Sequence, residues 1–197
     1  PTIQTIEKLS AILRANNYNI KTLMENLLSS EEFYSPRAYR SKIKSPAEFT
    51  IGLIRNTGAE TDGRKIANLM SEMGQTLFEP PDVAGWPEGI TWISSNTMIQ
   101  RLNYVHSITL SNLKGTHFNP HTSIVPTHPN SPDGFLKGCL ETMLDGNINP
   151  SSREILMTQL RTLENLTDQS GEKVFSNEEI MRQLAFFVLA SPEFQLN

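Results

Sequence analysis

The feature that most constrains the fold is a helical spacing of apolar residues that recurs along most of the chain. Leu occurs 21 times and Ile 16 times, whereas Val occurs five times. A β-sheet protein would normally use more Val, because β-branched side chains suit a pleated surface. The stripes with a spacing of three or four residues are Ile3, Ile6, Leu9 and Leu13; Leu23, Leu27 and Leu28; Phe49 and Leu53; Ile66, Leu69, Met70 and Met73; Met98, Leu102 and Val105; Leu136, Leu140, Met143 and Leu144; Leu156, Leu160 and Leu163; and Ile180, Leu184, Phe187 and Val188.

These stripes predict an all-α fold, an irregular bundle of about eight helices. The ends of the stripes carry residues that commonly cap helices. Gly74 and Gly146 follow the last apolar residue of their stripes, where a left-handed cap is expected. The segment from Ser45 to Glu48 has an N-cap hydroxyl, a proline at the first helical position and the acid of a capping box. No strand pattern is longer than the five residues from Gly89 to Ile93.

Composition excludes several classes of protein. The 197 residues include 17 Lys and Arg against 21 Asp and Glu, a net charge of −4, which argues against a general nucleic-acid binder. No apolar run approaches the roughly 18–20 residues that span a bilayer. The single cysteine, Cys139, has no partner for an internal disulfide, and it lies on an apolar helix face, which predicts a buried and unreactive thiol.

Two stretches lack the helical pattern. Residues 78–92 form a loop rich in Pro, Gly and Trp, and residues 113–134 contain four of the prolines and three of the four histidines. The second stretch predicts a long surface connection, 113–130, between sub-parts 1–112 and 131–197. Each sub-part is small for a core of its own, so we expect them to pack together as one helical domain over residues 1–197.

The loop at 78–92 is the densest in chemical groups. It holds both tryptophans and three carboxylates. Indole faces beside acids suit a sugar-stacking or acid/base site, for which Asp82 and Glu79 are the catalytic candidates and Trp86 and Trp92 the binding candidates. Asp82 comes first, because the rigid proline before it limits its movement.

The same loop also suits a purely structural role, which the sequence favours. Pro80 and Pro81 stiffen an extended entry, and Gly85 permits a tight turn. Trp86 and Trp92 would then be large apolar plugs that wedge the loop against neighbouring helices.

The helix expected at 93–112 begins with polar residues. Ser94, Ser95 and Asn96 predict an N-cap, with an anion seat at the exposed N–H groups as the alternative; Asn96 is retained as a binding candidate. Arg101 lies two turns into this helix. It is expected to form a salt bridge or brace a loop rather than contact a ligand, and it is the last binding candidate.

Other polar groups predict no metal or cofactor. His117, His121 and His128 share the Pro-rich stretch with Asp133, but Pro120 disfavours the helix that would align two of them on a metal. The chain has no GxSxG, HExxH, Walker or dinucleotide-binding motif. No cofactor and no metal site are therefore expected.

The one basic cluster comprises Arg37, Arg40, Lys42 and Lys44. It predicts a solvated linker, with contact to an acidic protein as the alternative.

A short pattern occurs twice, in Leu27–Phe33 and in Val188–Phe194. In both segments an apolar helix ends and a serine caps a new turn with acid in its first positions. The phenylalanine can then fold back onto the preceding helix. A recurrent helix–turn device explains this better than duplication.

Three blocks give the chain a resemblance to the C-terminal part of a bacterial family, domain of unknown function 1800. They follow the family's order and spacing over nearly the whole chain, and the second is quite specific. The chain departs from the family at Ser95 and Glu88, which weakens Ser94 and Glu88 as site residues. The blocks are Leu27-Leu28-Ser29-Ser30-Glu31-Glu32-Phe33 followed by Lys42-Ile43-Lys44-Ser45-Pro46; Leu77-Phe78-Glu79-Pro80-Pro81-Asp82-Val83-Ala84-Gly85-Trp86 through Trp92-Ile93; and Ser191-Pro192-Glu193-Phe194-Gln195.

The resemblance implies a C-terminal piece of a longer, extracytoplasmic protein, either periplasmic or secreted, whose upstream part is the first expected partner. The start at Pro1, without Met or a signal segment, also favours a piece of a longer chain. No activity is established for the family, so the resemblance supplies no catalytic residue.

Three hypotheses about function follow. The first is a non-catalytic helical module with a structural or interaction role, which predicts buried Trp86 and Trp92. The second is a subdomain of a hydrolase-like enzyme that contributes residues 78–96 to a site, which predicts a groove containing Asp82 with Glu79 or Glu88. The third is a partner-binding module that uses the basic residues 37–44. The sequence leans away from catalysis by this chain alone.

Overall fold

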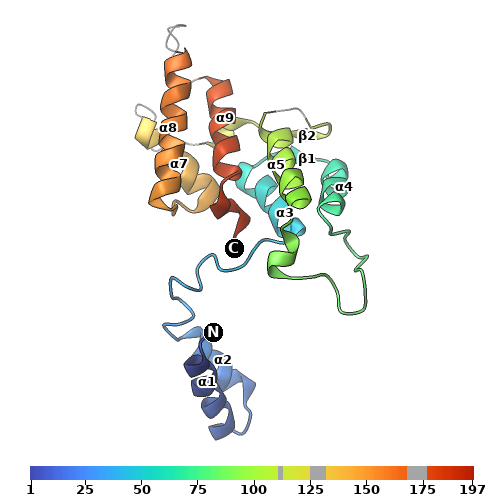
Figure 1. The fold of residues 1–197 in the computed structure, drawn as a ribbon, viewed down its shortest axis with the longest axis vertical. Coiled ribbons are helices and arrows are strands. Elements are labelled where there is room, and N and C mark those ends of the chain that lie inside the picture. The colour runs from blue at the N-terminus through green and yellow to red at the C-terminus, as the bar shows by residue number, and fades with distance from the viewer. Residues whose placement is uncertain (111–112, 125–131, 168–176) are drawn as a thin grey trace. The chain divides into compact units, whose positions relative to one another are not determined.

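The computed structural model describes residues 1–110, 113–124, 132–167 and 177–197, without the side chains of 164–167. Nine α-helices lie in these ranges, which confirms the all-α prediction (Figure 1). None of the described helices has the length and apolar character needed to cross a membrane. The helices are α1 (Ile3–Ala15), α2 (Ile20–Leu28), α3 (Pro46–Thr57), α4 (Arg64–Glu72), α5 (Ser95–Thr109), α6 (Pro120–Ser123), α7 (Pro132–Leu144), α8 (Pro150–Thr167) and α9 (Glu178–Leu189), with strands β1 (Glu60–Thr61) and β2 (Thr116–His117) and short 3₁₀ helices η1 (Gly89–Trp92) and η4 (Pro192–Gln195).

The chain forms two compact units, residues 1–41 with Asn197, and residues 42–196. This boundary precedes α3 and differs from the 113–130 connection at which the sequence divided the chain. Helices on both sides of that connection, α5 and α9, pack together in the second unit. That residues 1–197 make one domain stays a prediction.

The first unit is a helical hairpin with almost no interior. Helices α1 and α2 are capped by Thr2 and Asn19, whose side chains accept hydrogen bonds from the first turns. Of residues 1–41, all of which the structure describes, only Thr5 is fully buried. The predicted stripe of α1 is covered only in part, because Ile3 is 76% and Ile6 52% exposed, whereas Leu9 and Leu13 are half-buried.

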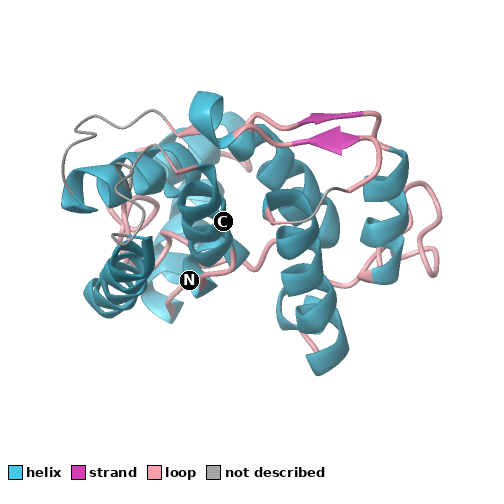
Figure 2. Ribbon diagram, turned by 90° about the horizontal axis from the view of Figure 1, so that it is seen from above, coloured by secondary structure: helices cyan, strands magenta, loops and turns pink. Residues whose placement is uncertain are grey.

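The second unit has a continuous apolar core. Helix α9 packs against α5, α6, α7 and α8, while α3 packs against α4, α6 and α7 (Figures 1 and 2). The core draws Leu53 from α3, Tyr104 from α5, Leu140 from α7 and Leu184 from α9. The last turn of the chain adds Phe194, which is wholly buried.

The predicted helix ends are present. Ser45 and Glu48 form both hydrogen bonds of the capping box at the start of α3. Gly74 and Gly146 have φ angles of 98° and 79°, in the left-handed region that glycine reaches without strain. The stretch Gly89–Ile93 is not a strand, because its residues 89–92 form the 3₁₀ helix η1.

The described part of the 113–130 connection corrects the prediction of a surface segment. Strand β2 pairs antiparallel with β1, as the magenta arrows in Figure 2 show. Phe118 and Ile124 are buried in the core. Arg182 of α9 donates through Nη2 to the Phe118 carbonyl oxygen, at 2.9 Å. Pro120 also begins helix α6 rather than preventing a helix, since proline lacks only a donor that the first turn leaves unpaired anyway.

Candidate functional site

The Pro/Gly/Trp-rich loop runs clear of the helices between α4 and η1 (Figure 1). Phe78 is 94% exposed, Val83 110% and Ile90 71%. Leu77 is also exposed. We call residues 77–91 the apolar loop. The prediction of an inward-facing wedge is wrong for Phe78, Val83 and Ile90, because these side chains face solvent.

The two tryptophans differ in burial. Trp92, at the end of η1, is 6% exposed and fits the predicted plug. Trp86 is half-buried. The expectation of two buried indoles therefore holds for Trp92 alone.

Local turns fix the backbone of the apolar loop. The Ala84 N–H donates to Oδ1 of Asp82 at 2.7 Å, and the Gly85 N–H donates to the Asp82 carbonyl oxygen at 3.2 Å. The Thr91 hydroxyl donates to the Glu88 carbonyl oxygen at 2.6 Å. Phe78 has a φ of 67°, a conformation unfavourable for a bulky side chain. The loop thus holds an apolar side chain outward on a constrained backbone.

Asp82, the first catalytic candidate, closes one of these turns. Its carboxylate makes an Asx turn with Ala84, which is a common structural use of aspartate. Asp82, Glu79 and Glu88 are all exposed, whereas Arg101 is wholly buried and makes no ion pair with any described residue. The structure therefore does not bring Asp82, Glu79 and Arg101 together.

We predict that Asp82→Ala loosens the loop without unfolding the protein. Losing the Asx turn removes the partner of the Ala84 N–H, so hydrogen exchange at the Ala84 amide should accelerate about tenfold, as expected for a hydrogen bond worth about 1 kcal/mol or slightly more. Mass-spectrometric exchange on the loop peptide measures this. Asp82→Asn is the matched control, because it keeps the acceptor oxygen. Equal exchange in both variants would contradict the assignment.

Arg101 braces two chain segments from inside the core. Its Nη2 donates to the Lys44 carbonyl oxygen at 2.7 Å and its Nη1 donates to Oε1 of Gln195 at 3.1 Å. The guanidinium carbon lies 4.8 Å from the centre of the Phe49 ring, a cation–π contact. Burial lowers the pKa of Arg101 to about 10, so the side chain remains charged at neutral pH.

Lys44 completes this buried brace. Its backbone N–H donates to the Gln195 carbonyl oxygen and its Nζ donates to the Phe194 carbonyl oxygen, both at 2.8 Å. The Nζ atom also lies 4.0 Å from the centre of the Phe194 ring. Lys44 is thus engaged within residues 42–196. Lys42 forms a surface ion pair with Glu48 at 3.6 Å. The other two residues of the predicted basic cluster, Arg37 and Arg40, belong to the unit formed by residues 1–41.

The start of α5 is an N-cap, as the sequence favoured. Oγ of Ser94 accepts from the Thr97 N–H at 3.2 Å, and the Thr97 hydroxyl accepts from the Ser94 N–H at 2.8 Å. Ser95 and Asn96 are exposed. Thr97 was not among the candidate residues, although it occupies the acceptor position of a capping box.

The histidine candidates lie on separate elements. His117 is in β2 and His121 in α6, while His128 lies outside the described residues. Asp133 pairs with Arg153 at 2.8 Å. Among the described residues, no group of three or more His, Cys, Asp or Glu side chains is placed to hold a metal ion.

Cys139 is fully buried on α7, and burial raises the pKa of its thiol. We predict that it resists alkylation in the native protein, because the thiolate is the reactive form. Iodoacetamide labelling followed by intact-mass measurement tests this. Rapid modification is expected in urea, and equal rates with and without urea would contradict the prediction.

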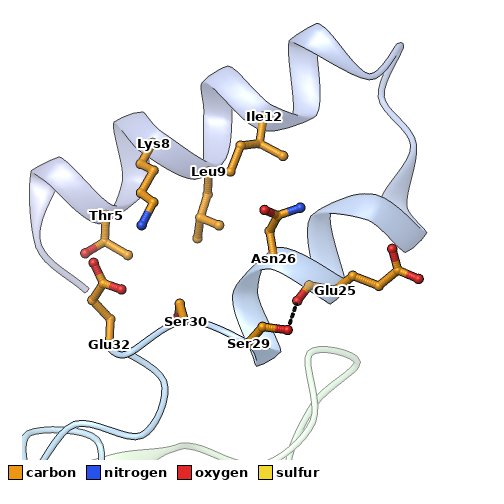
Figure 3. Close-up of a pocket in the computed structure, with 9 residues that line it drawn as sticks. All are labelled: Thr5, Lys8, Leu9, Ile12, Glu25, Asn26, Ser29, Ser30 and Glu32. Atoms are coloured by element: carbon orange, nitrogen blue, oxygen red, sulfur yellow. Dashed lines mark hydrogen bonds between the residues drawn. The ribbon is translucent and has the colours of Figure 1, made fainter.

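Two cavities lie in the unit formed by residues 1–41, and neither was expected from the sequence. The first, about 400 Å³, lies between α1 and α2, where Figure 3 shows Lys8 and Leu9 pointing from α1 toward α2. The second, about 470 Å³, is lined by Leu27, Phe33 and Arg37 among others. The second cavity is the more apolar of the two.

Comparisons with known proteins bear on the family alone. No curated protein and no solved structure matches the chain. The family described as "Protein of unknown function (DUF1800)" matches residues 1–196. Because that match spans nearly the whole sequence, and because it agrees with the three blocks found in the sequence, the chain belongs to the DUF1800 family.

Proposed function

We propose that this chain is a non-catalytic helical interaction module of an exported bacterial protein, and that it docks through the apolar loop. The observation that carries the proposal is the outward position of Phe78, Val83 and Ile90 on a constrained backbone. Isolated exposed apolar residues are ordinary on protein surfaces. A group of them within one loop is typical of interaction sites.

The constrained backbone supports docking for a second reason. Binding costs less conformational entropy when a loop is already held in one shape. Pro80 and Pro81 restrict the entry of the loop, and the Asp82 turn holds its centre. A loop that merely connected α4 to α5 would need neither the outward phenylalanine nor the prolines.

The other two hypotheses have less support. A hydrolase-like site needs convergent groups, but Asp82 is engaged in an exposed turn and Arg101 is buried in the core. A basic docking surface at 37–44 loses Lys44, which is bound to the last turn of the chain.

Site-specific photocrosslinking tests the proposal. Benzoylphenylalanine replaces Val83 in the natural full-length protein, in the bacterium that makes it, and the cells are irradiated. We expect a discrete crosslinked product that disappears when Phe78→Ser is added. Ile155, 62% exposed on α8, is the matched control position and should give no such product. Equal crosslinking at both positions, or none at position 83, would refute the proposal.

The proposed location has its own test. An extracytoplasmic protein should be degraded by protease added to spheroplasts, while a cytoplasmic marker stays intact. Protection of the protein until the membrane is lysed would exclude export.

A further inference from the structure

The exposed apolar side chains of the apolar loop lie beside uncompensated negative charge. Between Lys65 and Arg101 the sequence has no Lys or Arg. The four carboxylates in this stretch are exposed, and none forms an ion pair with a described residue. They belong to Glu72, Glu79, Asp82 and Glu88. A surface that docks on this loop therefore needs an apolar recess bordered by positive charge.

Residues 1–41 provide such a recess. The cavity of about 470 Å³ has Leu27 and Phe33 in its lining, and Arg37 lies at the same site. From Phe33 to Ser41, within the same unit, the sequence contains Arg37 and Arg40 and no acid. Glu32, which also lines the cavity, is the one acidic group there.

The helical hairpin that forms this recess also buries few of its own side chains. A helical unit of about 40 residues rarely supplies enough core to be stable alone, and in residues 1–41 only Thr5 is fully buried. Tyr34, whose ring lies edge-on to that of Phe33 at 5.2 Å between centroids, is 74% exposed. Apolar side chains inserted here would complete a missing interior.

We propose that the apolar loop of one copy of this chain inserts Phe78 and Val83 into the Leu27–Phe33–Arg37 recess of a second copy. This inference rests on the proposed function, because it names the partner of the same loop. Arg37 then faces the loop carboxylates, and apolar contact supplies most of the affinity. Since the two surfaces differ, the contact is heterologous, and each copy offers one loop and one recess.

Two variants separate the surfaces. Phe78→Ser with Val83→Ser disables the loop and leaves the recess intact, whereas Arg37→Glu disables the recess and leaves the loop intact. All three substituted side chains are exposed, so the variants should keep the circular dichroism of the parent. Ile155→Ser is the matched control for removing an exposed apolar group.

Sedimentation velocity over a range of concentrations, at low and high salt, gives the readout. The parent and Ile155→Ser should form species that grow with concentration beyond a dimer, because a heterologous contact leaves a free loop and a free recess. High salt should weaken the association, because screening reduces the attraction between Arg37 and the loop carboxylates. Glu32→Gln should strengthen association, because it removes the like charge from the recess.

Mixing gives the decisive result. Each disabled variant alone should be monomeric, and an equimolar mixture should form a dimer and nothing larger, because only one intact loop and one intact recess remain. A monomeric parent at every concentration overturns the inference. So does association that survives the loop substitutions, or a mixture that stays monomeric. If the position-83 crosslink joins the chain to a different protein, the inference falls while the proposed function stands.

Discussion

Arg101→Ala is expected to lower the free energy of unfolding of residues 42–196 by about 3–5 kcal/mol. The substitution removes two hydrogen bonds and leaves the partly buried Lys44 carbonyl oxygen and the buried Oε1 of Gln195 without their donor. It also leaves a cavity beside Phe49, because the Arg101 side chain is among the largest that are fully buried. Arg101→Lys should cost less, since an ammonium keeps the charge and one of the two bonds.

Urea unfolding followed by tryptophan fluorescence measures this effect, because both tryptophans lie in the affected unit. Arg64→Ala is the control. Arg64 is exposed on α4, so its loss should change the free energy by no more than about 0.5 kcal/mol. An Arg101→Ala cost below about 1 kcal/mol would mean that the brace contributes little.

Phe194→Ala is expected to destabilise the same unit by about 3–5 kcal/mol. Phe194 is wholly buried, its ring packs edge-on to Phe49 at 5.5 Å between centroids, and Lys44 lies over it. Removing the ring opens a cavity where the last turn of the chain meets α3.

The segment Leu27–Phe33, which has the same short pattern as Val188–Phe194, supplies a matched control. Phe33 occupies the equivalent place after Leu27 and Leu28, yet it is 44% exposed. Phe33→Ala should therefore leave the fluorescence-detected unfolding of the 42–196 unit unchanged within about 0.5 kcal/mol. Comparable losses from the two substitutions would show that the two segments have equivalent roles, contrary to the structure.

The periodicity of apolar residues reveals which segments are helical, and this explains which parts of the fold could be predicted from the sequence. A spacing of three or four residues correctly placed the helices except α6, and the serine–proline–acid pattern correctly placed the start of α3. The buried face of α5 was only partly identified. Its register includes Arg101, Tyr104, Val105 and Ile108, and a charged residue in an otherwise apolar register is the signal that was available but not used.

The sequence could not determine whether the apolar loop is buried or exposed. Two tryptophans and two adjacent prolines fit both a wedge and an exposed loop, because composition does not reveal which neighbours cover a segment. The same limit applies to the two cavities of residues 1–41, since a cavity depends on how far two amphipathic helices separate rather than on their pattern. The catalytic candidates remain predictions, although Asp82 has a structural partner.

The pairing between Ile43 and Leu196 joins the two ends of the larger unit, which runs from Lys42 to Leu196. Its entry and exit points therefore lie next to each other, as in domains that tolerate insertion into a host protein or circular permutation. Chain added at either end would leave from the same place on the unit and would not have to cross its surface. Pulling the two ends apart would load this pairing directly, together with the neighbouring hydrogen bond from the Lys44 N–H to the Gln195 carbonyl oxygen.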